Sequence, residues 1–354
     1  RFLSLDLLKA LPKLSLGKTL IGVLGNYFKS EKLKLSFTFQ SKYLGMSAWD
    51  CPGAFAILPY VEHAYGVYHV TGGLSEISQG MAKVCEEHGV DIRLNSPVKQ
   101  LTLDGRNVTG VELADGEKVF ADETVLNADF GYAMKNLVPS GVLKKYTPEK
   151  VDSKEYSCST FMLYLGLDKV YDLPHHTIFF AGDYKKNIED VFKNKVLSDD
   201  VSFYVRNASI NDSTLAPDGH SALYVLVPVP NCTADIDWLE NTEAFKEKVI
   251  SSMEKKAEMS DIREHIKEEI VYTPKTWMDT NIQFGATFNM AHSLNQMMHL
   301  RPRNKFEDLG NCYLVGGGTH PGSGLPTIYE SGRIAANMIS KRHGAVFVSK
   351  NTQI

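Results

Sequence analysis

The sequence predicts a mixed α/β fold in which one domain carries a second domain as an insertion. Three observations support this fold class. A strand-like run at 312–315 breaks into a glycine-rich loop and resumes as a helix from Pro326 to about Lys341. Residues 66–129 combine a helical segment with several short strands. Residues 132–298 contain longer apolar strands that are rich in β-branched and aromatic residues.

Length and composition indicate a globular protein. A chain of 354 residues normally forms two domains. Its hydrophobic content of 43% and net charge of −4 offer no basic excess for nucleic acid. No apolar run reaches the roughly 18–20 residues that span a bilayer. The five cysteines are scattered without a C-x-x-C pair, and the histidines lack ligand spacing, so we expect a reducing cytoplasm and no metal site.

The glycine-rich loop is the strongest candidate site. Five glycines within the nine residues 316–324 allow backbone N–H groups to approach a ligand without Cβ atoms in the way. Pro326 lies near the first helical turn and fixes where the helix N-terminus points. That terminus carries about half a positive charge and several free donors. The pattern predicts a cofactor cradle, with a purely structural turn as the alternative.

The N-terminal region has a different texture. Residues 2–29 are leucine-rich with interleaved lysines, and Pro12 and Gly17 should divide them into two short helices. These helices either pack on a core or form a basic amphipathic surface on a membrane, from which an insoluble substrate could enter.

Residues 66–129 should form a helix followed by short strands. Apolar residues at helical spacing predict a helix with one buried face: Leu74, Ile77, Met81 and Val84. Alternation predicts a strand next: Val90, Ile92 and Leu94. The turn dipeptides Asp104-Gly105 and Asp115-Gly116 then separate the strands of a three-stranded meander, and residues 124–126 form a final strand.

Residues 132–298 should form a sheet with helices. Buried strands are predicted at 161–165, 202–205 and 223–227. An amphipathic helix is predicted at 242–259 with these residues inward: Phe245, Val249 and Met253. The methionine-rich stretch 289–298 suits either a flexible apolar tunnel or ordinary core packing.

Several motifs resemble one family. Asn311-Cys312-Tyr313-Leu314, the glycine loop and Ser331 closely resemble the C-terminal FAD-binding signature of bacterial-type phytoene and diapophytoene desaturases. These are carotenoid desaturases of the flavin amine-oxidase superfamily. Other matching motifs follow the same order along the chain from Phe2 to about Arg342, among them Gly72-Gly73-Leu74, Asn95-Ser96-Pro97-Val98 and Asn127-Ala128-Asp129.

The resemblance implies an FAD/NAD(P)-binding Rossmann-like domain with an inserted substrate-binding domain of mixed sheet and helices. The chain is then expected to divide into a substrate- or membrane-facing helical part at 1–65, an FAD-domain part at 66–131, the substrate-binding domain at 132–300, a C-terminal FAD-binding segment at 301–345 and a tail at 346–354. No G-x-G-x-x-G fingerprint is present. We therefore expect an N-terminally truncated chain that lacks at least one βαβ unit of about 30 residues.

The function implied by the resemblance is FAD-dependent desaturation of a long isoprenoid, phytoene or diapophytoene, in carotenoid biosynthesis. Desaturation removes a hydride and a proton from adjacent carbons, and side chains cannot accept hydride, so a flavin is required. Val98 would offer backbone contacts to the adenine. The remaining expected cofactor-binding residues are Gly316, Gly317, Gly318, Thr319, Pro321, Gly322, Gly324, Leu325 and Pro326.

Asp6 and Lys9 match the family's Asp-x-x-Arg position beside the flavin, with lysine in place of arginine. They are the candidate catalytic residues, and an exposed Asp6 that caps a helix is the alternative. Lysine loses the planar bidentate fork of arginine.

Alternative functions share the same scaffold: carotenoid isomerases, terminal oxygenases and retinol-saturase-like reductases. A truncated chain that holds no flavin is a further alternative. We expect a cytoplasmic protein peripherally associated with the membrane. The substrate's chain length, the number of desaturations, the electron acceptor and the oligomeric state stay open.

Overall fold

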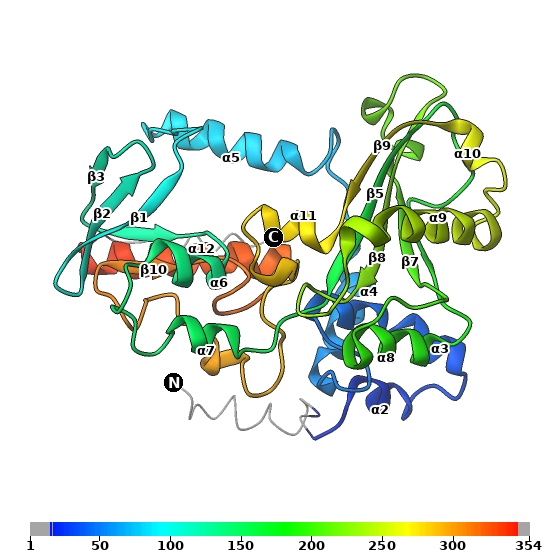
Figure 1. Cartoon of the computed structure of the whole chain (residues 1–354), viewed down its shortest axis with the longest axis horizontal. Helices are drawn as coiled ribbons and strands as arrows, with labels where there is room; N and C mark the ends of the chain where they lie inside the picture. Colours follow the sequence, from blue (N-terminus) through cyan, green and yellow to red (C-terminus); the bar gives the residue numbers. More distant parts are fainter. Residues whose placement is uncertain (1–14, 16, 346–354) are drawn as a thin grey trace.

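The structure, a computed structural model, describes residues 15 and 17–345. Two sheet-containing halves lie side by side, and a group of short helices near the N-terminus lies beside the second half (Figure 1). The mixed α/β fold class is confirmed. Buried apolar residues form three clusters, one in each half and one among the N-terminal helices.

The N-terminal helices are short, and hydroxyl side chains cap two of them. They are α2 (Leu20–Leu24), α3 (Glu31–Ser36), η2 (Phe39–Leu44), η3 (Gly53–Ala56) and α4 (Ile57–Tyr65). The Thr19 and Ser30 hydroxyls accept the first-turn N–H groups of α2 and α3. Helix α2 corresponds to the second of the two helices predicted within 2–29, and the first lies outside the described residues.

The first half contains two small sheets. An antiparallel meander is formed by β1 (Val98–Asp104), β2 (Asn107–Leu113) and β3 (Lys118–Phe120), as predicted. Strand β4 (Thr124–Leu126) pairs in parallel with β10 (Cys312–Leu314), so two predicted strands from distant parts of the chain are neighbours. The glycine loop follows β10 and leads into α12 (Leu325–Arg342), which also confirms the predicted strand, loop and helix.

The predicted burial of the helix at 74–84 is wrong. Helix α5 (Ser75–Glu87) forms, but none of its residues is buried. Leu74, Met81 and Val84 are 56, 49 and 51% exposed. Within the described residues no element covers this apolar face. The strand expected at 90–94 is also wrong, because that segment has no neighbouring strand to pair with and is irregular.

The second half is built on an antiparallel sheet of five strands. Its strands are β5 (Ser159–Leu167), β6 (His176–Phe179), β7 (Phe203–Asn207), β8 (Ser221–Val229) and β9 (Ile266–Tyr272), in the order β6-β7-β8-β5-β9. Helix α9 (Trp238–Lys256) covers one face and buries Phe245, Val249 and Met253, as predicted. The strands predicted at 161–165, 202–205 and 223–227 are confirmed as β5, β7 and β8.

Shorter elements connect these layers. They are α6 (Phe130–Tyr132), η4 (Ala133–Leu137), α7 (Pro148–Asp152), α8 (Tyr184–Glu189), η5 (Asp190–Asn194), η6 (Ala208–Ile210), η7 (Ser213–Leu215), α10 (Ile262–His265), α11 (Pro274–Asp279), η8 (Gln283–Gly285) and η9 (Met298–Leu300). Buried residues within 133–151 pack in the same cluster as Leu126 and Leu314. Met290 also belongs to that cluster. The predicted domain boundaries stay a prediction.

The described residues contain no candidate membrane span and no candidate metal cluster. None of the helices in that part of the chain is long and apolar enough to span a bilayer. Among the same residues, no group of three or more His, Cys, Asp and Glu side chains is placed to hold a metal ion.

Candidate cofactor and substrate site

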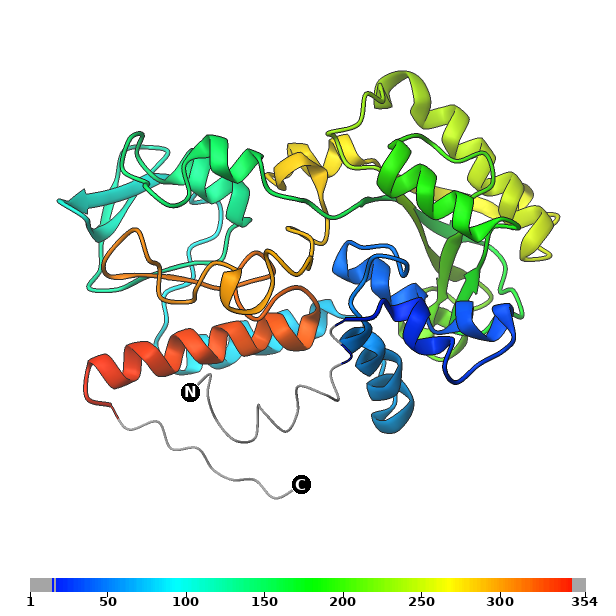
Figure 2. The same ribbon diagram turned by 90° about the horizontal axis from the view of Figure 1, so that it is seen from below.

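The glycine loop is held from both ends. Val315 donates its N–H to the Leu126 carbonyl at 3.0 Å, which extends the β4–β10 pairing into the loop. Gly316 donates to the Ser331 hydroxyl at 2.9 Å, so the loop folds back onto the helix that follows it. Figure 2 shows α12 running along the outside of this half. The loop is therefore a fixed turn between strand and helix.

The glycines of the loop serve different purposes. Gly322 has a φ of +140°, and a Cβ there would lie 2.3 Å from the Nε2 atom of His292. A Cβ on Gly318 would lie 2.4 Å from the Cβ of Phe130. These two glycines make room for protein side chains. Gly324, at φ +104°, is exposed, and its nearest neighbour would be the Thr327 hydroxyl at 3.5 Å. Within the loop, the backbone is exposed with free space beside it only at the end that carries Gly324.

The exposed end of the loop fits a flavin. Gly324 caps α12 without a side-chain hydrogen bond, and Leu325 and Pro326 are exposed. The Thr327 hydroxyl oxygen lies 2.6 Å from the Ser323 carbonyl oxygen and 2.8 Å from the Gly324 carbonyl oxygen, and it donates its one proton to this pair, which fixes the first turn. Uncapped N–H groups at a helix N-terminus favour an electron-rich partner. The residues present would therefore suit the electron-rich edge of a flavin ring.

His292 connects the loop to the N-terminal helices. It is 4% exposed, and its Nδ1 atom lies 3.1 Å from the Leu44 carbonyl oxygen. Its Nε2 atom accepts the Ser323 N–H at 3.1 Å. A carbonyl only accepts and an amide only donates, so Nδ1 carries the proton and the ring is neutral. Burial, followed by the nearby charge of Arg301, lowers the pKa of His292 to about 3.

Arg301 is completely buried and holds three carbonyl oxygens. Its guanidinium donates to Met290 at 3.0 Å, to Ala291 at 3.3 Å and to Gly317 at 2.7 Å. Burial lowers its pKa to about 10, so it stays charged at neutral pH. Because these carbonyls belong to two segments, Arg301 clamps the chain at 290–291 against the glycine loop.

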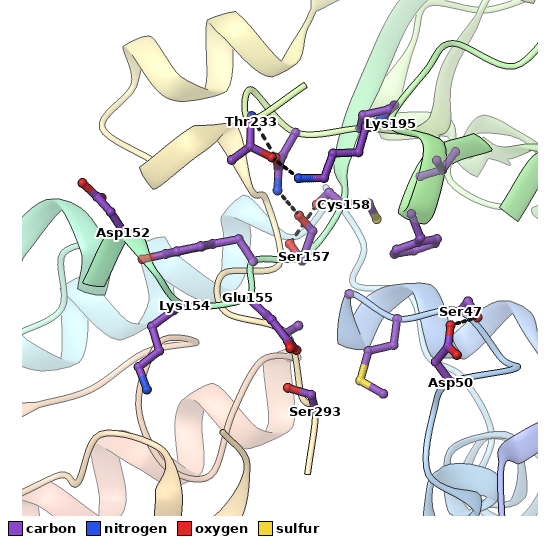
Figure 3. A pocket seen from close by; sticks show the side chains of 18 residues that line it. Ser47, Asp50, Asp152, Lys154, Glu155, Ser157, Cys158, Lys195, Thr233 and Ser293 are labelled. Carbon is purple, nitrogen blue, oxygen red and sulfur yellow. Dashed lines mark hydrogen bonds between the residues drawn. The ribbon is translucent and has the colours of Figure 1, made fainter. Parts of the chain in front are cut away.

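A cavity of about 470 Å³ lies on the other side of the same chain segment (Figure 3). Its lining comes from the segments 45–50, 152–158, 191–195, 230–233 and 291–293. The cavity thus lies where the two halves and the N-terminal helices meet. Ala291 and Ser293 line the cavity, whereas His292 between them bonds to the loop. This run of residues is a wall shared by the cavity and the loop.

The cavity lining includes charged and hydroxyl side chains, several of which are paired with each other. The Lys195 ammonium donates to the Thr233 hydroxyl at 2.8 Å, and the Ser47 hydroxyl donates to Asp50 at 2.8 Å (Figure 3). Burial raises the pKa of the Cys158 thiol to about 12 and also raises the pKa of Tyr156. Both groups are neutral at physiological pH. The cavity can bind a ligand, but it presents no activated thiolate or phenolate.

The predicted site residues are distributed unevenly. The loop residues 316–326 are together, although the Thr319 hydroxyl points inward and donates to the Pro302 carbonyl at 2.6 Å. Val98 begins β1 and is 37% exposed, in a sheet separate from the β4–β10 pair. Asp6 and Lys9 lie outside the described residues. The cofactor and catalytic assignments of all these residues stay predictions.

His292 and Arg301 were not found by the sequence analysis. Each is a single residue without a spacing rule, and each acts through backbone atoms that are distant in sequence. Arginine is mostly exposed in proteins, so neither residue type gave a signal of burial in the sequence.

Comparisons with known proteins bear on the family and the fold. The family model of the flavin containing amine oxidoreductases matches residues 9–340. The structure resembles that of an oxidoreductase from Methanosarcina mazei, with a TM-score of 0.63 and 14% identity over 95% of this chain and 74% of that one. It also resembles a putrescine oxidase variant, with a TM-score of 0.56 and 13% identity over 94% of this chain and 69% of that one. These two likenesses show the fold.

Sequence relatives are more informative. The chain is 56% identical to a 4,4'-diapophytoene desaturase (4,4'-diapolycopene-forming) from a Methylomonas species, over 98% of this chain and 68% of that protein. It is 40% identical to an all-trans-zeta-carotene desaturase of Myxococcus xanthus, over 92% of this chain and 63% of that protein. The chain thus spans about two thirds of these relatives. The family match supports the predicted flavin cofactor. The chain belongs to the flavin containing amine oxidoreductase family, among its carotenoid desaturases.

Proposed function

We propose that this protein is an FAD-dependent desaturase of a long isoprenoid hydrocarbon of the diapophytoene or phytoene class. The observation that carries the proposal is the 56% identity to a diapophytoene desaturase over 98% of the chain. The reaction removes two hydrogens from adjacent carbons and leaves a new double bond.

The chain's own residues would bind and orient the reactants. When bound, FAD supplies the hydride acceptor that side chains lack. The N–H groups at the start of α12, beside Gly324, would face the electron-rich part of the flavin and stabilise negative charge there. Arg301 and His292 would keep the loop in place from behind. The roles predicted for Asp6 and Lys9 are part of this proposal.

The hydrocarbon needs apolar surface more than polar anchors. Burial of each CH₂ group contributes about 0.8 kcal/mol, so a C30 chain can be held by apolar and aromatic walls alone. Selection between C30 and C40 substrates would depend on the length and shape of the bound region.

We also propose a peripheral association with membranes, where such hydrocarbons reside. The support comes from α4 and the residues that follow it. This segment exposes large apolar and aromatic side chains: Ile57, Tyr60, Val61, Tyr65, Val67 and Tyr68. Tyrosine is enriched where proteins meet the lipid headgroup region. We call these six residues the α4 face.

The test of function is product analysis. The protein, expressed with its full coding region, is placed in a host that makes diapophytoene or phytoene, and the extracted hydrocarbons are separated and weighed by mass spectrometry. Desaturation gives products that are lighter by two hydrogens per step and absorb at longer wavelength. An isomerase leaves the mass unchanged, a reductase adds two hydrogens and an oxygenase adds oxygen. Any of these three patterns without loss of hydrogen would contradict the proposal.

A further inference from the structure

The five-stranded sheet has two unlike faces. Side chains alternate along each strand, and α9 covers the face that carries Leu163, Val205 and Val225. The opposite face carries Tyr164 on β5 and Tyr224 on β8, which are direct partners in the sheet register. Both side chains are half-buried, whereas the side chains on the α9 face are completely buried. The sheet therefore leaves one aromatic face partly open.

The aromatic side chains on the open face form a continuous row across four strands. Ring centroids are 6.0 Å apart between Tyr204 and Tyr224, 5.5 Å between Tyr224 and Tyr164, and 5.9 Å between Tyr164 and Tyr272. Trp277 on α11 continues the row at 4.7 Å from Tyr272. The three tyrosine pairs are close to perpendicular, so ring edges and ring faces alternate along the row. We call these five residues the aromatic row.

A cavity of about 500 Å³ lies beside Tyr164 and Tyr224, the middle pair of the aromatic row. The two tyrosines form part of its lining, together with the apolar residues Leu215 and Ile270. The lining also includes three charged residues: Arg206, Glu268 and Glu269. Ile270 is 58% exposed although it lies on a strand, so no described element covers this edge of the cavity. Gly166 also lines the cavity and carries no side chain that would fill it. The middle pair of the row, Tyr164 and Tyr224, is thus accessible to a ligand from outside.

The cationic group at the rim of this cavity already has protein partners. The Arg206 guanidinium donates to the Nδ1 atom of His69 at 2.9 Å. The Nε2 atom of His69 lies 2.6 Å from Asp212, whose carboxylate has its pKa held low by the Thr214 hydroxyl and by His69. Arg206 therefore needs no anionic ligand, and the cavity does not select for one.

We propose that the aromatic row is a binding surface for an extended conjugated polyene. A polyene is flat, rigid and apolar, and its length suits a row of rings that crosses several strands spaced about 4.8 Å apart. Ring faces and edges both make favourable contacts with a π system. The choice of ligand rests on the proposed function. The location of the binding surface is inferred from the ring positions, from the open cavity and from the fact that Arg206 at its rim is already paired with His69.

Cross-strand aromatic pairs also stabilise sheets, so the row has a second possible purpose. The two purposes predict different effects of removing the rings. If the rings bind a ligand, their loss lowers the affinity for that ligand; if they stabilise the sheet, their loss lowers the free energy of unfolding. Replacement by phenylalanine keeps the rings, and replacement by alanine removes them, while thermal unfolding of each variant reports the structural part separately.

The experiment measures binding without turnover. The purified full-length protein is titrated with 4,4'-diaponeurosporene in detergent micelles, and the dissociation constant is taken from quenching of tryptophan fluorescence. Squalene, a C30 isoprenoid without conjugation, is the comparison ligand and is measured by its competition. We expect the double variant Tyr164→Ala/Tyr224→Ala to bind the polyene about tenfold more weakly, which corresponds to one aromatic contact of ordinary strength per ring. The double phenylalanine variant should stay within about twofold of the original protein.

The matched control is Tyr27→Ala, because Tyr27 is an exposed tyrosine that lies away from the sheet. It should leave binding unchanged. An alanine variant that unfolds at the original temperature and binds the polyene as tightly as the original would overturn the inference. The inference would also be overturned if squalene displaced the bound polyene as strongly as a second polyene does. A different result would separate this inference from the proposed function. If the protein binds the polyene only when the rings are present but forms no desaturated product, the inference stands and the proposed function is wrong.

Discussion

The Nε2 atom of His292 accepts the backbone N–H of Ser323 at 3.1 Å, and through this bond a buried neutral histidine fixes the glycine loop. The opposite nitrogen donates to the Leu44 carbonyl. One imidazole therefore joins the N-terminal helices to the loop that is proposed to hold the flavin. A charged ring could not make both bonds, because Nε2 would then carry a proton.

Replacing His292 by alanine should destabilise the protein by about 2–4 kcal/mol, because the Ser323 amide and the Leu44 carbonyl lose a partner inside the protein. Chemical unfolding measures the free energy. His88→Ala, at the exposed end of α5, is the control and should change the free energy by less than about 0.5 kcal/mol. Equal stability of the two variants would show that the His292 bonds contribute nothing.

The low pKa of His292 predicts an acid sensitivity. Its pKa is about 3 in the folded protein and has the ordinary value of 6.5 when unfolded. As pH falls below about 6.5, the unfolded chain gains a proton that the folded chain does not bind, so stability is lost. This contribution approaches about 1.4 kcal/mol per pH unit.

The measurement is the free energy of unfolding between pH 7 and pH 5 for the original protein and for His292→Gln. Burial also lowers the pKa values of His175 and His176, so the original slope includes them. The difference between the two slopes isolates His292. Parallel slopes would contradict the neutral, buried state of the ring.

Gly322 and Gly324 should respond differently to alanine. At Gly322 the new Cβ would meet His292, and the protein should lose more than about 2 kcal/mol of stability. At Gly324 the space is open, so only the positive φ opposes the change, at about 1 kcal/mol. Flavin absorbance per chain should nevertheless fall in Gly324→Ala. Full flavin content in that variant would remove Gly324 from the proposed cofactor contacts.

Arg301→Met should be strongly destabilising. It removes the donors to three buried carbonyl oxygens, which should lower the free energy of unfolding by about 3 kcal/mol or more. Arg303→Met is a matched control, because 68% of the Arg303 side chain is exposed and its ion pair with Glu307 is at the surface. If both variants unfold alike in urea, the clamp has no energetic role.

The α4 face should carry membrane binding. Tyr60→Ser combined with Tyr65→Ser should reduce co-sedimentation with phosphatidylcholine and phosphatidylglycerol vesicles by about tenfold, since two interfacial aromatic rings are lost. Phe120 on β3 is also largely exposed but lies in the other half, and Phe120→Ser should leave vesicle binding unchanged. Equal losses in both variants would indicate non-specific adhesion.

Local patterns predicted the elements that are stabilised within themselves or by neighbours close in sequence. The meander follows from Asp104-Gly105 and Asp115-Gly116, and α9 follows from the spacing of Phe245, Val249 and Met253. The strand, loop and helix around 312–341 follow from glycine and proline placement.

Sequence patterns gave wrong predictions where an element needs a packing or pairing partner from elsewhere in the fold. The apolar spacing of α5 shows that one face is suited to burial, but it cannot show whether the chain supplies a cover. The alternation at 90–94 likewise requires an adjacent strand. His292 and Arg301 act on carbonyl and amide groups of remote segments, and only the folded backbone brings those groups within reach.

The wall formed by Ala291, His292 and Ser293 is shared by the cavity and by the loop that is proposed to hold the flavin. An occupant of the cavity that displaces this wall would alter how firmly the glycine loop holds its own ligand. Thermodynamic reciprocity then requires the loop's ligand to change the affinity of the cavity by the same factor.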